Sequence, residues 1–361
     1  MVDPAAVTHR ERARELVVKY GWNSTAYQIL NPGIEYWFSS AWPAMAAYVR
    51  RGNMIVVAGS PICVDGALPE VCREFEQFAR MQGCRVCYVC AEERLLAALE
   101  SAGRHAAIAM GAQPVWAPSH WPQIVRERAS LRAQFSRARN KGIEIEEIES
   151  VSAAHDPNLR RVLEDWIRGR RLPPLHFLVE PNVLDGELVD RKVLVARRDG
   201  KAIAFLVASP VPARNGYLVE LLARSGEAPN GTSELLIDDA MARFAAAGCE
   251  YVTLGLVALA HASDDAIARH PLWLRAMMRF ARAHANRFYN FRGLERFRLK
   301  MGPERWETIY AVSNEPRFSL RTLYSIGGAF AGISPWRAIA IGLGKAIGDE
   351  ARTLTRPKRT G

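Results

Sequence analysis

The sequence predicts a mixed α/β fold (α+β) built as two domains, and three observations support this prediction. The chain has 361 residues, which suits two domains of ~100–200 residues each. Hydrophobic residues make up 49% of it and charged residues 24%, as is typical of proteins that bury a core and unlike disordered chains. Segments with strand-like alternation and segments with helical periodicity follow one another along both halves, which favours sheets covered by helices.

Strand and helix patterns alternate through residues 1–110. The sequence MIVVAGSPI is apolar and ends in the turn residues Gly-Ser-Pro, which is typical of a buried strand. Val71, Phe75 and Phe78 recur at helical spacing, and Gly83 follows them, so we expect a helix that ends there. The expected helices are 8–20, 69–82 and 92–102, and the expected strands are 54–62 and 84–90.

A basic helix and an acidic strand are expected between the two halves. IVRERASLRAQFSRARNK (124–141) predicts one basic helix ended by Gly142, and IEIEEIE (143–149) alternates like a strand with an acidic face. In the second half, the turn of a hairpin is expected at Arg198-Asp199-Gly200. The further expected elements are helices over 157–170, 233–247 and 270–287, the hairpin over 193–211, and strands over 216–224 and 250–257.

The net charge of the chain is +10, and 41 of its 48 basic residues are Arg. Such an excess suits an anionic partner, namely nucleic acid, phospholipid headgroups or a phosphorylated substrate. The alternative is a GC-rich genome that uses Arg wherever a solvated cation is needed. The excess is concentrated in two segments, with +5 in 124–141 and +8 in 269–305.

The sequence offers no sign of export or of a membrane span. The N-terminal residues are charged throughout, unlike a signal peptide, and no segment reaches the ~18 apolar residues of a spanning helix. We therefore expect a cytoplasmic protein whose six cysteines are reduced, buried thiols rather than metal ligands. After Pro335, an apolar stripe among basic residues suits a helix on the inner face of the cytoplasmic membrane, or one packed on its own domain.

Three segments carry a resemblance to a known family. They are GYLVELLARSGEAPNGTSELLIDDAM (216–241), AAAGCEYVTLGLVAL (245–259) and FYNFRGLERFRLKMGPERWETIYAV (288–312). In this order they resemble the C-terminal catalytic region of phosphatidylglycerol lysyltransferases, most specifically at Ala-Pro-Asn-Gly-Thr (228–232). YGWNSTAYQ, the strand ending in Gly-Ser-Pro and LRAQFSRARNKG match more loosely, so the resemblance covers about residues 15–320.

The resemblance implies two fused GNAT folds that transfer an amino acid from aminoacyl-tRNA to a lipid hydroxyl. The hairpin, strand, helix, strand order of the second half also resembles a GNAT core. The expected organisation is an N-terminal GNAT-like domain (1–150), a C-terminal GNAT-like catalytic domain (151–320) and a basic amphipathic tail (321–361). Well-known members carry an integral-membrane flippase domain before this region, and this sequence shows none.

The expected partners are aminoacyl-tRNA as co-substrate and an anionic, phosphatidylglycerol-like lipid as acceptor, with no cofactor and no metal. The CoA-binding signature of ordinary GNAT enzymes is missing, which favours aminoacyl-tRNA as donor. Two alternatives remain. One is an acyl-CoA-dependent GNAT-type acyltransferase acting on a small amine or amino acid, and the other is a non-catalytic membrane-surface or RNA-binding module.

Aminoacyl transfer needs a group that accepts the proton of the attacking hydroxyl, and cations or N–H groups that stabilise the carbonyl oxygen. Glu220 and Arg224 lie near the end of an expected central strand, where the family has an Asp near an Arg. Lys300 is a rare Lys in an Arg-rich chain. We expect these three as catalytic residues, and the alternatives are a solvated carboxylate and ordinary surface cations.

The other expected site residues bind the substrate or an anion. The turn before the helix over 233–247 can present N–H groups to an anion, or simply cap the helix. Asp238 suits an ammonium partner or a helix surface, and His176 suits a pocket wall. The expected substrate-binding residues are Asn230, Gly231, Thr232, Asp238 and His176, and those for tRNA or phosphate are Arg132, Arg137, Arg139, Lys141, Arg292 and Arg298.

Overall fold

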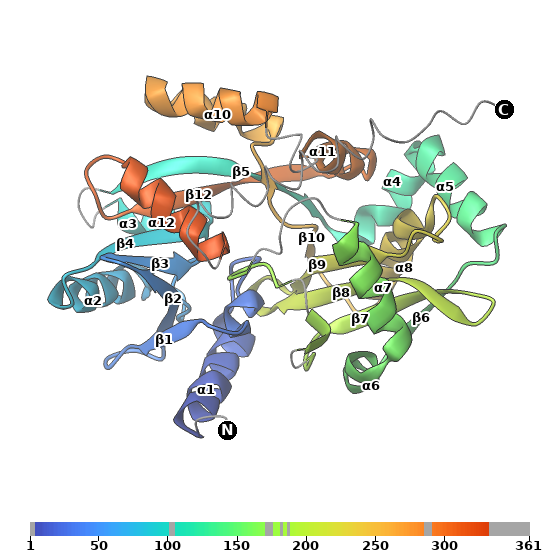
Figure 1. The fold of residues 1–361 in the computed structure, drawn as a ribbon, viewed down its shortest axis with the longest axis horizontal. Coiled ribbons are helices and arrows are strands. Elements are labelled where there is room, and N and C mark those ends of the chain that lie inside the picture. The colour runs from blue at the N-terminus through green and yellow to red at the C-terminus, as the bar shows by residue number, and fades with distance from the viewer. Residues whose placement is uncertain are drawn as a thin grey trace, which may run out of the picture.

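A computed structural model describes residues 4–100, 105–169, 176–180, 183–185, 188–284 and 291–331. One twelve-stranded sheet runs through this part of the chain, with helices packed around it (Figure 1). The predicted mixed α/β fold is therefore confirmed. None of the helices in these ranges is both long and apolar enough to cross a bilayer. The predicted tail beyond residue 331 lies outside the described residues.

The first half of the sheet is an antiparallel group followed by a parallel βαβ unit. β1 (Glu35–Phe38), β2 (Met45–Arg51) and β3 (Met54–Ala58) pair antiparallel in that order. β3 and β4 (Arg85–Ala91) are parallel neighbours, joined by α2 (Leu68–Met81). Parallel neighbours require such a crossover connection.

The second half repeats this plan. β7 (Lys192–Arg198), β8 (Lys201–Val211) and β9 (Gly216–Arg224) pair antiparallel. β9 and β10 (Tyr251–Thr253) are parallel neighbours, joined by α8 (Thr232–Ala246). The hairpin, strand, helix, strand order expected from the sequence is confirmed.

Two long strands are exchanged between the halves at the centre of the sheet. β5 (Ala106–Trp116) follows the first half in sequence but pairs with β10 of the second half. β12 (Arg305–Ser313) follows the second half but pairs with β4 of the first, and β5 and β12 also pair with each other. The sheet is therefore continuous, and the boundary expected near residue 150 stays a prediction (Figure 1).

The remaining described elements lie at the edges and around the sheet. β6 (Glu144–Ile148), the strand expected over 143–149, pairs with β7 at one edge, and β11 (Val257–Ala258) pairs with β5. The other helices are α1 (Pro4–Tyr20), α3 (Glu93–Leu99), α4 (Trp121–Glu127), α5 (Ala129–Arg139), α6 (Ser150–His155), α7 (Pro157–Arg168), α9 (Asp264–Ala268), α10 (Leu272–His284), α11 (Phe291–Lys300) and α12 (Leu320–Ala331).

The structure differs from the sequence expectation in two places near the basic segments. The helix expected over 124–141 is two helices, α4 and α5, because Arg128 between them has the non-helical angles φ −116° and ψ 88°. The strand expected over 250–257 ends at Thr253, because Gly255 has φ +72° and turns the chain toward β11. Single backbone angles of this kind are not encoded in hydrophobic periodicity.

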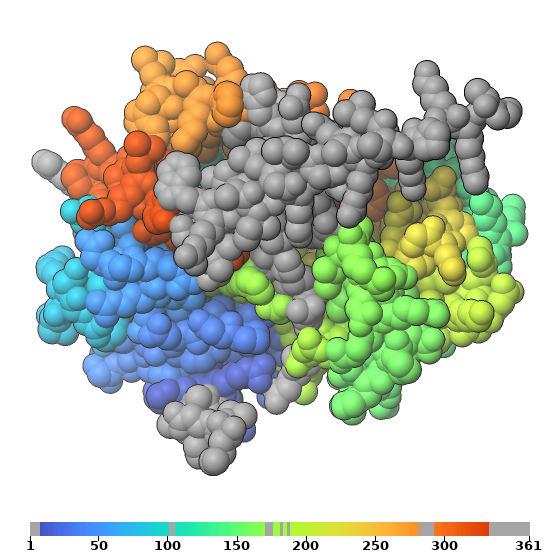
Figure 2. Space-filling model, viewed as in Figure 1, coloured from blue at the N-terminus to red at the C-terminus, as the bar shows by residue number. Residues whose placement is uncertain are grey.

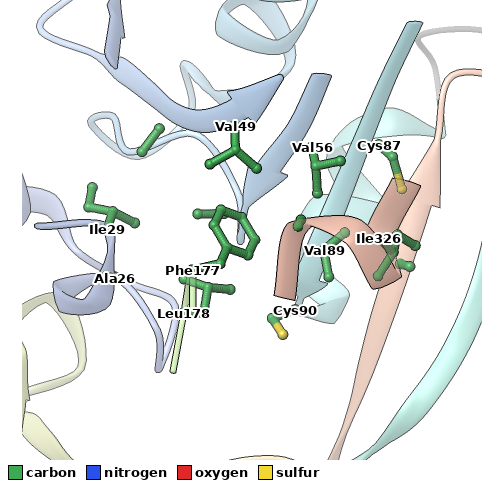
Figure 3. Packing of buried hydrophobic residues seen from close by; sticks show 14 of the residues in the cluster. Ala26, Ile29, Val49, Val56, Cys87, Val89, Cys90, Phe177, Leu178 and Ile326 are labelled. Atoms are coloured by element: carbon green, nitrogen blue, oxygen red, sulfur yellow. The ribbon is translucent and has the colours of Figure 1, made fainter. Parts of the chain in front are cut away.

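The core of the first half is closed by segments that are distant in sequence. Val49 and Val56 of the sheet pack in one cluster with Ile326 of α12, with Ile29 and with Phe177, which follows the first half (Figure 3). The second half therefore contributes to the core of the first. All six cysteines are buried free thiols, as expected. Within the described ranges, no group of side chains is arranged to hold a metal ion.

Candidate active site

Glu220 lies on a β-bulge in β9. The register with β8 slips by one residue between Val219 and Leu221, and Glu220 is the extra residue at that point. A bulge re-aims the side chain of its extra residue, and bulges are common beside active sites. The Glu220 side chain is only 11% exposed.

Both carboxylate oxygens of Glu220 accept hydrogen bonds. Arg191 Nε donates to Oε1 at 2.6 Å, and Gln28 Nε2 donates to Oε2 at 2.5 Å. Gln28 belongs to the first half, in the short helix η1 (Tyr27–Leu30), whereas Arg191 directly precedes β7. Glu220 is thus held from both halves of the molecule. An ionised carboxylate has about four lone-pair positions, so acceptor capacity remains for a ligand.

Gln28 supplies a second acceptor beside this carboxylate. Gln28 is 2% exposed, and its Oε1 is buried with no hydrogen-bond partner among the described residues. Such an atom costs free energy unless a ligand or an ordered water completes it. Two adjacent acceptors suit a group rich in donors, such as an ammonium or a hydroxyl.

Residues 22–31, which we call the joining segment, position Gln28. Toward the first half, Ser24 Oγ donates to Gln113 of β5 at 2.7 Å. Toward the second half, the Tyr27 hydroxyl donates to Asp190 Oδ2 at 3.0 Å. Buried polar side chains are stable only when hydrogen-bonded. The hydrogen bonds of Ser24 and Tyr27 therefore hold the joining segment between the two halves.

A second buried polar group, which we call the central charge cluster, consists of Glu92, Gln113, Arg214, Tyr251 and Glu307. Arg214 donates to Glu307 at 2.6 and 2.9 Å and to Glu92 at 3.1 Å. Its guanidinium lies 3.6 Å from the ring centroid of Tyr251. Gln113 donates to Tyr251 at 3.0 Å and to Glu307 at 3.1 Å. The cluster therefore joins the exchanged strands β5 and β12 to their neighbours.

The two carboxylates of the central charge cluster have pKa values shifted in opposite directions. Burial raises the pKa of Glu92 above its ordinary value, against the opposing charge of Arg214. Burial also acts to raise the pKa of Glu307, but the hydrogen bonds and charge of Arg214, the hydrogen bond from Gln113 and the charge of Arg305 together hold that pKa below its ordinary value. Arg214 thus pairs with both carboxylates, and the exposed Arg305 pairs with Glu307 as well, at 3.1 Å. Because its members already bond to one another, we assign this cluster to structure rather than to substrate.

Lys300 contacts the first turn of α8. Its Nζ donates to Glu234 Oε1 at 2.7 Å, and the Lys300 side chain is 29% exposed. This pair ties the end of α11 to the start of α8. Among the described residues, no hydrogen bond or ion pair joins Lys300 to Glu220, so the expected catalytic residues fall into two groups. The roles of both groups stay predictions.

The turn before α8 packs closely on α5. Gly231 has φ +98°, and a Cβ atom there would lie 2.3 Å from the carbonyl oxygen of Gln134, so this position requires glycine. Thr232 is fully buried, and its hydroxyl donates to the Pro229 carbonyl at 2.8 Å. It therefore holds the turn and does not cap α8, whose N-cap is Gly231. Asn230 is exposed at the tip of the turn.

Asp238 faces the basic helices. Trp121 Nε1 donates to one of its oxygens and Arg139 to the other, both at 3.0 Å. Both partners lie on the pair of helices α4 and α5, so Asp238 ties α8 to that pair. An ammonium bound there would have to share these oxygens, and a substrate role for Asp238 stays a prediction.

Two further expected site residues lie at the surface. Arg224 is exposed at the end of β9, and nothing in the described part of the chain hydrogen-bonds its side chain. The backbone N–H of His176 donates to the Phe330 carbonyl at 2.8 Å, and its half-exposed ring lies 3.6 Å from Glu180. His176 therefore marks the contact with α12, whereas Arg224 is free to meet an anion.

The residues expected to bind tRNA or phosphate are mostly exposed. Arg137, Lys141 and Arg292 are exposed on or beside α5 and α11, and so is Arg139. Arg132 is exposed too, but it donates to the Val125 carbonyl at 3.0 Å and closes the end of α4.

Arg298 differs from the others, because it is 9% exposed and donates to the Leu254 carbonyl. That bond fastens α11 to the segment after β10. A phosphate backbone at the surface would not reach a guanidinium held in this way.

Sequence reasoning missed Gln28, Arg191 and the central charge cluster. Gln28 ends YGWNSTAYQ, one of the segments that carry the family resemblance, and this was the signal that could have identified it. Arg191 and Arg214 had no such signal, because they are two of 41 arginines. Their partners are identified only once distant strands are placed side by side.

Comparison with known proteins identifies the family. The model of "Phosphatidylglycerol lysyltransferase, C-terminal" matches residues 14–313. A phosphatidylglycerol lysyltransferase of Staphylococcus epidermidis is 22% identical over 301 residues, which are 82% of this chain and 35% of that protein. An MprF-like domain protein of Mycobacterium tuberculosis is 25% identical over 243 residues, which are 65% of this chain and 50% of that protein. The chain thus spans about a third to a half of these relatives.

Solved structures share the fold. The C-terminal domain of a lysylphosphatidylglycerol synthetase from Agrobacterium fabrum matches with a TM-score of 0.75 at 22% identity, over 90% of this chain and 98% of that one. The structure of L-PGS from Bacillus licheniformis matches with a TM-score of 0.72 at 19% identity, over 91% and 97%. The tandem GNAT-like fold is thereby confirmed. Since the family model covers most of its length, the chain belongs to the phosphatidylglycerol lysyltransferase C-terminal family.

Proposed function

We propose that this chain transfers an aminoacyl group from aminoacyl-tRNA to the hydroxyl of a phosphatidylglycerol-like lipid. Membership of the family supports the reaction class, since relatives of Staphylococcus epidermidis and Bacillus subtilis are named phosphatidylglycerol lysyltransferases. The observation that carries the proposal is Glu220, on a bulge at the junction of the halves, beside the unfilled acceptor of Gln28.

The reaction exchanges one ester for another. The lipid hydroxyl oxygen attacks the carbonyl carbon of the aminoacyl ester, and the new C–O bond forms as the bond to the ribose oxygen of tRNA breaks. In the net reaction, the proton of the lipid hydroxyl is transferred to that ribose oxygen. A carboxylate beside the hydroxyl assists the proton transfer, and cations or N–H groups stabilise the charge that develops on the carbonyl oxygen.

The residues of the site are assigned from their contacts. In this proposal the Glu220 carboxylate accepts from the attacking hydroxyl, and Arg191 keeps it oriented through the bond at 2.6 Å. Gln28 Oε1 accepts from the ammonium of the aminoacyl group, which supplies the donor that this buried atom lacks. Arg224, exposed on the same strand as Glu220, meets a phosphate of the lipid or of the tRNA end.

The exposed basic residues around α5 and α11 are assigned to the tRNA backbone. Phosphate contacts position a nucleic acid without reading its sequence, and Arg and Lys are their usual donors. Arg137, Lys141 and Arg292 are exposed and meet this requirement. Lys300 lies near the start of α8, where its ammonium donates to Glu234.

The test measures transfer of a labelled amino acid into lipid. The purified 361-residue chain is incubated with total tRNA charged with radiolabelled amino acids and with phosphatidylglycerol vesicles, and the radioactivity of the organic phase is counted. We expect label in the organic phase only when both the charged tRNA and the vesicles are present. Absence of label with every charged amino acid, while a phosphatidylglycerol lysyltransferase labels the same vesicles, would contradict the proposal.

Binding measurements beside the transfer assay distinguish two other functions. Tight binding of CoA in calorimetry, without binding of tRNA, would replace the proposal with an acyl-CoA-dependent acyltransferase. Binding of tRNA or vesicles without transfer of label would instead indicate a non-catalytic module.

A further inference from the structure

Helix α10 is held on the molecule by one narrow face. Leu274 is fully buried in the core cluster of the first half, and Met278, one turn later, packs against that cluster. Just before the helix, His270 is buried and its Nε2 accepts from the Ala109 N–H of β5 at 3.0 Å. These contacts fix both the position and the rotation of α10.

The exposed side of α10 carries large apolar residues. Leu272 is 78% exposed, Trp273 41%, Met277 39% and Phe280 65%. Trp273, Met277 and Phe280 follow one another at spacings of four and three residues, so they share one face of the helix. In Figures 1 and 2, α10 lies at the upper margin of the molecule, on the outer side of β5 and β12.

The charged residues of α10 itself are all arginines, of which Arg282 is paired with Asp264 of the preceding helix α9 at 2.7 Å. Arg275 and Arg279 lie on α10 between the exposed apolar residues, and Arg279 is exposed. The sequence has no acidic residue between Asp265 and Glu295. α10 thus combines an outward apolar stripe with flanking arginines, and no carboxylate within the helix offsets their charge.

We propose that α10 docks this protein on an anionic bilayer, with its apolar stripe in the headgroup–acyl boundary and its arginines on lipid phosphates. Amphipathic helices with bulky apolar residues and basic flanks bind the membrane interface in this way. A nucleic acid would use the arginines but would leave Leu272 and Trp273 exposed to water. The inference rests on the lipid acceptor of the proposed function and gives the orientation in which that lipid is met.

Flotation with vesicles tests the docking. Wild-type protein is expected to float with vesicles that contain both phosphatidylglycerol and phosphatidylcholine. With vesicles of phosphatidylcholine alone, it is expected to remain in the bottom fraction. Leu272→Ser/Trp273→Ser is expected to lower the partition coefficient roughly tenfold, because it removes two large apolar side chains that would be buried in the membrane interface. Arg275→Gln/Arg279→Gln is expected to lower it and to weaken its dependence on salt.

The matched control is Met81→Ser/Val151→Ser, which removes apolar side chains that are 75% and 66% exposed on α2 and α6. This control is expected to float like the wild type. Equal flotation of the α10 variants and the wild type would overturn the proposal. So would a dimer in size-exclusion chromatography that Leu272→Ser/Trp273→Ser dissolves, because a second copy would then occupy the stripe.

A second readout separates the docking from the chemistry. Transfer of amino acid to phosphatidylglycerol in vesicles is expected to fall in Leu272→Ser/Trp273→Ser, whereas transfer to short-chain phosphatidylglycerol dispersed in solution is expected to persist. Flotation of the wild type without any transfer would leave the docking intact and refute the proposed function. Equal losses of transfer with both lipids would refute the docking role, because they would place α10 in the catalytic machinery.

Discussion

The two halves of the sheet share one plan, but their corresponding strands carry different residues. In the first half, β3 is apolar and buried at all five positions and continues into Gly-Ser-Pro. Its counterpart β9 carries Glu220 on a bulge and ends in the exposed Arg224. The βαβ framework by itself therefore needs no polar group on this strand. The charged residues of β9 are therefore the ones that call for a functional explanation.

The first half nevertheless contributes a residue to the candidate site of the second half. Its joining segment, residues 22–31, delivers Gln28 to Glu220 at 2.5 Å. Arg214 of the second half then links the two halves through Glu92, which follows β4, and through Glu307 of the exchanged strand β12. The halves are thus asymmetric in chemistry and dependent on each other in structure.

The largest expected effect on stability comes from removing Arg214 from the central charge cluster, which joins the two halves. Arg214→Met leaves the buried Glu92 without its cation, removes one of the two arginines that pair with Glu307, and is expected to cost about 3–5 kcal/mol of unfolding free energy. Arg243→Met is the control, because Arg243 forms ion pairs at a 40% exposed position and is expected to cost less than about 1 kcal/mol. Urea unfolding measures the unfolding free energy of both variants. Equal losses of unfolding free energy would show that the central charge cluster does not stabilise the contact between the halves.

A smaller loss of unfolding free energy is expected from removing the Glu307 carboxylate, and this loss should depend on pH. Its folded pKa lies below the ordinary value, so its contribution to stability is complete above about pH 4.5 and is lost as the pH falls through the folded pKa. Glu307→Gln is expected to lower the unfolding free energy by about 1.5–3 kcal/mol at neutral pH, the value of hydrogen bonds to charged groups. The gap between wild type and variant should narrow in acid. A gap of constant size between pH 7 and the acid range would contradict this.

The smallest expected effect concerns the basic surface of the second half. Arg137→Gln/Lys141→Gln should weaken tRNA binding a few-fold and reduce the slope of log affinity against log salt by up to about 2, since each lost phosphate contact removes about 0.9 or less. Arg73→Gln on α2 is the control, because Arg73 is 64% exposed but belongs to the first half. Filter binding over a salt series measures both. If Arg73→Gln has the larger effect, the tRNA surface has been assigned to the wrong half.

Much of the fold could be predicted from the sequence, because periodicity reports local structure. The order of strands around the hairpin over 193–211 was predicted, and so was the place of Glu220 on a central strand. The exchange of β5 and β12 could not be predicted, because the sequence of a strand does not show which strand it pairs with. The bulge at Glu220 was missed for the same reason, because it exists only in the register with β8.

The candidate site was predicted only in part. Lys300 was singled out for its rarity, but its partner Glu234 is 66 residues away in sequence. Glu220 is held by residues 29 and 192 positions away, Arg191 and Gln28. Arg298 was expected at the surface and is buried, because the charge of a segment does not say which side of a helix faces the core.

The measurement that tests the central claim most directly is the rate of aminoacyl transfer to lipid by Glu220→Gln. The substitution keeps the shape of the side chain but removes its charge and half of its acceptor capacity, so the rate is expected to fall about 10²–10⁴-fold. Glu144→Gln, at an exposed position of the edge strand β6, is the control and is expected to transfer at the wild-type rate. A Glu220→Gln protein that unfolds at the wild-type urea concentration and also transfers at the wild-type rate would contradict the account.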